Sequence, residues 1–302
     1  MKILNFGSCN IDYVYALPHI VAPGETISSL SLSTFPGGKG LNQSVALGRA
    51  GAMVYHAGCV GHDGQLLLDT LSESGVNIDY IQTLDTPSGH AIIQVDEKGE
   101  NSIIIHGGAN QSITPSMIDE VLSCVEEGDI LLLQNEISEL PYLVSKGKSK
   151  CMTVVWNVAP VTESARLVDL SKVDILLCNQ SEGMALADVS TPQDSIPALL
   201  QRYPNLRIVL TLGKAGGIYQ DSTQSVPYPA YQVTPVDTTA AGDTFAGYFV
   251  AALAEGKPIK ECLIWGALAS ALSVTKAGAS CSVPTKEEVE TARHTLKPYT
   301  AS

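Results

Sequence analysis

Short apolar runs alternate along the chain with longer segments in which apolar residues recur every three or four positions. The first pattern predicts buried strands and the second predicts amphipathic helices. The predicted strands are KILNFGS, MVYHAGCVG, DILLLQN, MTVVWNVAP, DILLCNQ and RIVLTLG, and predicted helices include GLNQSVALGRAG and DGQLLLDTLSESG. Because this alternation is typical of βαβ units, we expect a single α/β domain over residues 1–302, with a mostly parallel sheet covered by helices.

Two segments interrupt this alternation, at approximately 11–35 and 88–107. Both lack helical spacing and contain β-branched stretches and turn residues, Pro23-Gly24 in the first and Lys98-Gly99 in the second. They predict hairpins that form a small β subdomain inserted into the α/β body. A β flap beside a ligand cleft can act as a lid, and a largely apolar flap face can pair with a second copy of the chain.

Polar residues and glycines follow the predicted strands. In open parallel sheets, ligands bind at the carboxyl ends of the strands, so these positions are the first candidates for a site. They are Asn10, Asp12, Glu136, Asn157, Asn179, Thr211, Gly213 and Asp243.

Composition narrows the classes of function. The chain has 302 residues, 45% of them hydrophobic, and a net charge of −13, which argues against a nucleic-acid partner. Its seven cysteines form no CxxC and its six histidines are dispersed, so neither a disulfide framework nor a zinc site is expected. No apolar run approaches the roughly 20 residues that span a bilayer, and the amino terminus lacks a signal-peptide pattern. We therefore expect a soluble, cytoplasmic protein without a membrane partner.

Two polar stretches near the amino terminus are candidates for ligand binding. In FPGGKGLNQS (Phe35–Ser44), glycines surround Lys39 just before a helix, which fits either a tight turn or a backbone that approaches a ligand closely. In SCNID, Asn10 and Asp12 point the same way on an extended chain and can grip the hydroxyls of a polyol, although an Asx turn fits as well. The Walker A pattern GxxxxGK[ST] is missing from this stretch. No GxGxxG follows the first predicted strand, which argues against a nicotinamide-dependent oxidoreductase.

The strongest stretch is DTTAAGD, which places Asp243 where a loop becomes a helix. Small residues leave backbone N–H groups bare at a helix start, where they can bind a phosphate group. Asp243 there can be the base that accepts a proton from an attacking hydroxyl, or it can be the helix cap. The local sequence favours neither interpretation.

Two stretches, GGKGLNQSVALGRAGA and DTTAAGDTFAGYFVAAL, resemble the signatures of the ribokinase-like (phosphofructokinase-B) carbohydrate kinases. The resemblance runs from GSCNID to TKAGASCSVPT and so covers nearly the whole chain. It implies a three-layer α/β/α sandwich with a small β-sheet lid. It also implies transfer of the γ-phosphoryl group of ATP to the 5-hydroxyl of ribose. The alternative substrates are another neutral sugar, such as deoxyribose, another pentose or a ketohexose, and a nucleoside.

The resemblance assigns roles to the residues that match the family motifs. Asp243 would be the catalytic base, with the backbone of Ala240, Ala241 and Gly242 as the anion hole. The sugar would contact Asn10, Asp12, Gly38, Lys39, Asn42, Glu136 and Asp243, covered by Ala91 and Ile93 of the lid. The nucleotide would contact Asn179, Thr211, Gly213, Lys214, Gly216, Gly242 and Ala267. Glu182, in NQSE, would lie near Mg²⁺. An activating K⁺ would be bound at Asp237, Thr239, Ser273, Lys276, Gly278 and Ser282. A homodimer would form through the lid.

Two details refine these expectations. Many members of the family carry glycine where this chain has Ala240, and ribokinase-like enzymes often carry a polar residue at the position of Ala267. The second difference suggests that the base is recognised by shape and apolar contact. A non-catalytic sugar sensor on the same scaffold remains an alternative, but it should lack the base or the anion hole, and both motifs are present.

Overall fold

The structure, a computed structural model, describes residues 1–299, and its body is built around a nine-stranded sheet. The strand order is β13–β12–β11–β10–β9–β8–β1–β4–β5. The bounds are β1 (Ile3–Phe6), β4 (Val54–Gly61), β5 (Asn77–Leu84), β8 (Ile130–Gln134), β9 (Thr153–Asn157), β10 (Ile175–Asn179), β11 (Arg207–Thr211), β12 (Gly217–Gln220) and β13 (Ser225–Tyr228). All neighbours pair in parallel except β11–β12 and β12–β13. The prediction of a mostly parallel sheet is confirmed.

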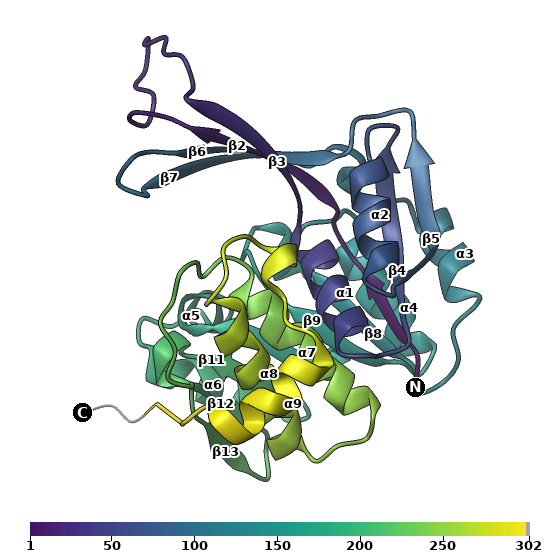
Figure 1. Ribbon diagram of the computed structural model, residues 1–302. Coiled ribbons are helices and arrows are strands. Elements are labelled where there is room, and N and C mark those ends of the chain that lie inside the picture. Colours follow the sequence, from purple (N-terminus) through teal and green to yellow (C-terminus); the bar gives the residue numbers. More distant parts are fainter. Residues whose placement is uncertain (300–302) are drawn as a thin grey trace.

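Helices cover both faces of this sheet (Figure 1). Side chains alternate between the faces, so Ile3 joins one apolar cluster and its neighbour Leu4 joins the other. The first face carries α1 (Lys39–Arg49), α2 (Gln65–Glu73), α7 (Ala241–Ala254), α8 (Ile259–Ser273) and α9 (Lys286–Thr295). The second carries α3 (Pro115–Leu122), α4 (Leu140–Ser149), α5 (Gln180–Ala187) and α6 (Pro192–Arg202). The result is the expected three-layer α/β/α sandwich.

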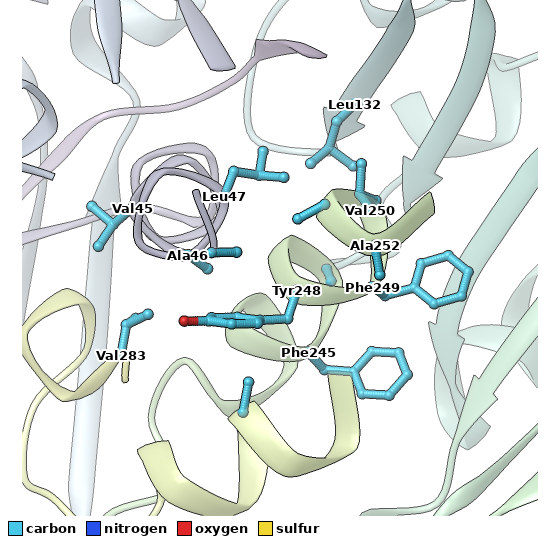
Figure 2. Close-up of a cluster of buried hydrophobic side chains, with 14 of the residues drawn as sticks. Val45, Ala46, Leu47, Leu132, Phe245, Tyr248, Phe249, Val250, Ala252 and Val283 are labelled. Carbon is cyan, nitrogen blue, oxygen red and sulfur yellow. The ribbon is translucent and has the colours of Figure 1, made fainter. Parts of the chain in front are cut away.

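Helices α1 and α7 pack very closely against each other. A Cβ atom on Gly247 of α7 would lie 2.4 Å from the Cβ of Ala46 on α1, so only glycine permits this approach. Figure 2 shows the surrounding cluster, in which the rings of Tyr248 and Phe249 are fully buried. Burial of each large apolar side chain contributes about 1.5–3 kcal/mol. This packing fixes the start of α7 relative to α1, and both helix starts belong to the site described below.

A second sheet projects from the body (Figure 1). Its four strands follow the order β3–β2–β6–β7, and we call it the lid sheet. The bounds are β2 (Asn10–Ala16), β3 (Ser31–Gly37), β6 (Gly89–Val95) and β7 (Asn101–His106). The predicted hairpins correspond to the antiparallel pairs β2–β3 and β6–β7, and a parallel pairing of β2 with β6 joins them. On this sheet, Asp12 lies in register with Phe35 on one side and with Ala91 on the other.

The sequence predicted neither a membrane-spanning helix nor a disulfide framework, and both points can be compared with the described residues. Over residues 1–299, we find no helix with both the length and the apolar character needed to cross a bilayer. All seven cysteines lie in the described part of the chain, and each has a free thiol.

Candidate active site

The glycine-rich stretch before α1 packs directly onto the chain that follows β1. Gly38 has φ 90°, a left-handed conformation that glycine adopts without strain. A Cβ on Gly40 would lie 2.3 Å from the backbone nitrogen of Ser8, and the N–H of Leu41 donates to the carbonyl of Ser8 over 2.8 Å. Glycine is therefore required at these two positions by the fold itself, because it lets the start of α1 pack against the end of β1.

Glu136 lies at the start of α1, held by two donors. Its Oε2 accepts from Ser8 Oγ at 2.5 Å and from the backbone N–H of Lys39 at 2.9 Å. Burial raises the pKa of Asp12 to about 7, and the negative charge of Glu136 adds to the rise. Asn10, also buried, accepts at Oδ1 from Asn110 over 2.8 Å. The amide and carboxylates predicted to bind a sugar thus gather where β2 leaves the body.

Asp243 lies in the first turn of α7 and is 5% exposed. Its two oxygens accept from side chains of α1: Asn42 Nδ2 at 3.2 Å and Gln43 Nε2 at 2.9 Å. The N-cap position of α7 is occupied by Ala240, and no side chain caps the helix. The interpretation of Asp243 as a helix cap is therefore wrong. Its carboxylate points toward α1, across the starts of both helices.

Two cavities adjoin the start of α7. The larger, about 630 Å³, is lined by Thr211, Gly213, Lys214, Gly216, Gly242 and Ala267, among others. The smaller, about 230 Å³, is lined by Lys39, Asn157, Asn179, Glu182 and the whole stretch from Ala240 to Asp243. Thr211, Ala241 and Gly242 line both cavities. The residues predicted to bind nucleotide therefore line two adjoining cavities, and Asp243 lines the smaller of them.

Lys39 is the cation of the smaller cavity. The nearby carboxylate of Asp243 raises the pKa of Lys39, burial opposes this effect, and Glu136 and Glu182 reinforce it. A protonated lysine here offsets negative charge and can attract the oxygens of a phosphate group.

Asn179 and Glu182 form a capping box at the start of α5. Asn179 Oδ1 accepts from the N–H of Glu182 at 2.9 Å, and Glu182 Oε2 accepts from the N–H of Asn179 at 2.8 Å. The NxxE spacing thus has a helix-capping role. It leaves the second carboxylate oxygen of Glu182 without a partner from this box. Within residues 1–299, no group of three or more Asp, Glu, His or Cys side chains is arranged so that it could hold a metal ion. A metal ion here would need ligands from a bound phosphate and water, as Mg²⁺ commonly does.

Asp237 joins the loop before α7 to the loop after α8. Its Oδ1 accepts from the N–H and hydroxyl of Thr239 at 2.9 and 2.6 Å, and its Oδ2 accepts from the N–H of Gly278 at 2.8 Å. Burial alone would raise the pKa of Asp237, but these hydrogen bonds outweigh it and lower the pKa. The N–H of Lys276 donates to the carbonyl of Ser273 at 3.1 Å, and Ser282 lies farther along the same loop. The residues predicted to bind a monovalent cation are thus partly brought together.

Comparison with known proteins identifies the family of this chain. The model of the pfkB family of carbohydrate kinases matches residues 1–286. The chain belongs to this family. The chain is 38% identical over 297 residues to a ribokinase of Bacillus subtilis, with 96% of this chain and 98% of that protein covered. A deoxyribokinase of Salmonella typhi is 28% identical over 298 residues, with 95% of this chain and 97% of that protein covered.

Among solved structures, the ribokinase of Arabidopsis thaliana complexed with ribose and ATP superimposes with a TM-score of 0.84. It is 29% identical, and the match covers 96% of this chain and 97% of that one. The α/β/α sandwich with its lid sheet is thus the fold of this pfkB-family kinase.

Several residues of this pfkB-family chain were not predicted as site residues. Gln43 directly follows Asn42 in the quoted motif, and its contact with Asp243 could have been suspected from that adjacency. Ser270, Ala271 and Val274 line the larger cavity together with Ala267, at helical spacing along and just beyond α8. The aromatic lining residues Tyr231 and Tyr299 carried no signal, because they come from separate irregular segments.

Proposed function

We propose that this chain is an ATP-dependent kinase that transfers the γ-phosphoryl group to the 5-hydroxyl of D-ribose, with Asp243 as the base. The observation that carries the proposal is the position of Asp243. Its buried carboxylate lies beside the backbone of Ala240–Gly242 at the smaller cavity and contacts Asn42, a predicted sugar ligand. A base so placed can take the proton of a hydroxyl that attacks a phosphate held at the start of α7.

The protein groups around this base suit phosphoryl transfer. The bare N–H groups at the start of α7 and the charge of Lys39 would stabilise the phosphate oxygens as negative charge develops. Bound Mg²⁺ would neutralise and align the phosphates, and Glu182, with one oxygen free of the capping box, would help to hold it through water. The larger cavity, lined by Ala267, Tyr231 and Val274 among others, would take the base and ribose of the nucleotide.

A monovalent cation, K⁺, would bind at the loops joined by Asp237. These loops include Thr239 and Gly278, and the first of them leads directly into Ala240. Such a cation would order the anion-hole loop from the side and would not touch the substrate.

A neutral sugar is favoured as the acceptor by the residues predicted to bind it. Asp12 and Glu136 supply carboxylate acceptors, and Asn10, whose oxygen accepts from Asn110, supplies its NH₂ as a donor, a set that suits a neutral polyol. The ribokinase of Bacillus subtilis and the ribose-bound structure from Arabidopsis thaliana support ribose as this sugar. The deoxyribokinase of Salmonella typhi keeps deoxyribose as the alternative substrate, and other neutral sugars and nucleosides follow.

The experiment is an ADP-release assay with ATP and Mg²⁺ over ribose, 2-deoxyribose, other pentoses, hexoses and nucleosides. We expect ribose to give the highest kcat/KM. A higher kcat/KM for deoxyribose would make deoxyribose the substrate and leave the proposed mechanism unchanged. If no sugar or nucleoside gives ADP release, the proposed kinase function is wrong.

We further propose a homodimer through the lid sheet. The face of the sheet that carries Asp12 also carries Phe35 and Ile105, which are 43% and 62% exposed. Ile104 points to the opposite face and is 58% exposed, so it provides a matched control. In light scattering, Ile105→Lys should give a monomer while Ile104→Lys stays dimeric. A monomeric wild type would contradict the dimer.

A further inference from the structure

A chain of buried side-chain amides runs beneath Asp243. Gln43, on the second turn of α1, is fully buried and faces the carboxylate. Its Nε2 donates to Asp243 Oδ1 at 2.9 Å and to Asn157 Oδ1 at 2.9 Å. Its Oε1 accepts from Gln134 Nε2 at 2.7 Å. Gln43 is thus bonded on both sides of its amide.

The chain continues away from the site into the body of the sheet. Gln134, the last residue of β8, is fully buried and also donates to Asn5 Oδ1 at 2.8 Å. Asn5, on β1, donates in turn to the backbone carbonyl of Gly40 at 2.8 Å. Three secondary-structure elements therefore hold one line of amides.

The acceptors at the two ends of this line determine which way round each amide is oriented. At one end the ionised carboxylate of Asp243 can only accept, so Nε2 of Gln43 must face it. At the other end the carbonyl of Gly40 can only accept, so Asn5 must present its NH₂ there and its oxygen to Gln134. Both requirements orient Gln134 in the same way. A flip of Gln43 would place its oxygen against the carboxylate and its NH₂ against that of Gln134.

We propose that Gln43 is the positioning residue of Asp243, with its own orientation fixed by Gln134 and Asn5. The proposal rests on the role of Asp243 as the base. Asn42 holds one carboxylate oxygen and Gln43 holds the other, so the carboxylate plane is fixed from two sides. Small displacements of a reacting group cost rate steeply, which makes such second-layer contacts important.

A variant of Gln134 can distinguish a positioning role of Gln43 from a general role in packing. Gln134 contacts neither Asp243 nor either cavity within the described chain, and it reaches the base only through Gln43. An effect of Gln134 on kcat at unchanged sugar KM would therefore pass through Gln43, whereas an effect through Glu136, two residues farther along the chain, would change the sugar KM. The two residues should be coupled in a double-mutant cycle.

The experiment measures kcat, the sugar KM and the thermal midpoint of four variants. Methionine replaces each glutamine at similar length without a donor, so the set is Gln43→Met, Gln134→Met, the double variant and Tyr248→Phe. We expect Gln43→Met to lower kcat by about 10–100-fold, the size of a misplaced reacting group, and to change the sugar KM by less than about threefold. Gln134→Met should lower kcat less, and the double variant should match Gln43→Met.

Tyr248→Phe is the matched control, because it removes a buried hydrogen bond outside this network. Tyr248 is fully buried on α7, the helix that carries Asp243, and its hydroxyl donates to the carbonyl of Pro284 at 2.7 Å, a hydrogen bond that involves no member of the amide line. Its loss should lower the thermal midpoint and leave kcat unchanged. A fall in kcat as large as that of Gln43→Met would show that stability alone explains the effect and would overturn the proposal.

Two other results would also overturn it: wild-type kcat in Gln43→Met, or losses that multiply in the double variant. If Gln43→Met does not fold, Gln134→Met alone is used, because it removes the donor to Gln43 and leaves the residues that touch Asp243 in place. Its kcat should fall, and wild-type turnover would again contradict the proposal. A wild-type protein that phosphorylates no sugar instead rejects the proposed function, so the two failures are distinguishable.

Discussion

Asn42 and Asp243 are 201 positions apart in the sequence, yet Nδ2 of Asn42 donates to Oδ2 of Asp243 over 3.2 Å. A predicted sugar ligand thus directly holds the predicted base. We expect Asn42→Leu, which keeps the shape and removes the donor, to raise the sugar KM and lower kcat about tenfold, since a buried hydrogen bond to a charged group contributes about 1.5–3 kcal/mol. Steady-state kinetics measure both. An unchanged kcat with an unchanged KM would contradict this arrangement.

The backbone of Ala240 leads to a second prediction. Ala240 has φ 57°, where a Cβ is strained and where many members of the family carry glycine. We expect Ala240→Gly to stabilise the protein by about 1 kcal/mol and to raise the thermal midpoint by about 2–4 °C. Ala241→Gly is the control, because Ala241 begins the helix, and it should destabilise by about 0.5–1 kcal/mol. Equal effects of the two changes would show that positive φ is not the cause.

Asp12 predicts a dependence of stability on pH. Burial and Glu136 raise its pKa from 3.8 to about 7, so the folded state disfavours the charged form. Its stabilising contribution is full below pH 4 and is lost as the pH rises through about 7. Urea unfolding at pH 5 and pH 8 should show Asp12→Asn gaining stability relative to the wild type at the higher pH. A difference that stays the same at both values would be inconsistent with a raised pKa.

Asp237 predicts a dependence on monovalent cations. Its carboxylate ties Thr239 to Gly278, beside the loop that enters Ala240. Activity should be higher in potassium than in sodium or choline at equal ionic strength. Asp237→Ala should lower kcat and abolish the difference between the cations. A wild type indifferent to the cation, or a variant that potassium still activates, would remove the proposed cation site.

The sequence predicted the parts of this structure that depend on local pattern. The strands β1, β8 and β11 follow from apolar runs, and the carboxyl ends of the parallel strands are where the site gathers. The two lid hairpins follow from turn residues and β-branched stretches. The parallel pairing of β2 with β6 did not follow, because it joins strands far apart in the chain without a turn between them.

Contacts between distant polar residues could not be predicted in the same way. Nothing in the local sequence relates Gln134 to Gln43 or Ser8 to Glu136, since each pair meets only when separate strands and helices pack. The two interpretations of Asp243 were equally compatible with its neighbours. The position of Ala240 as the N-cap excludes the cap, and the role of Asp243 as the base stays a prediction.

The most direct test of Asp243 as the base is a comparison of Asp243→Asn with the wild type. Asparagine keeps the shape and removes the ability to accept the proton. Single-turnover phosphoryl transfer to ribose, or to the sugar the panel selects, should slow by at least about 10²–10⁴-fold, the usual contribution of a general base. Calorimetric affinities for sugar and ATP should stay within about threefold of the wild type if the variant has lost only chemistry. Near-normal transfer by a folded Asp243→Asn protein would contradict the account.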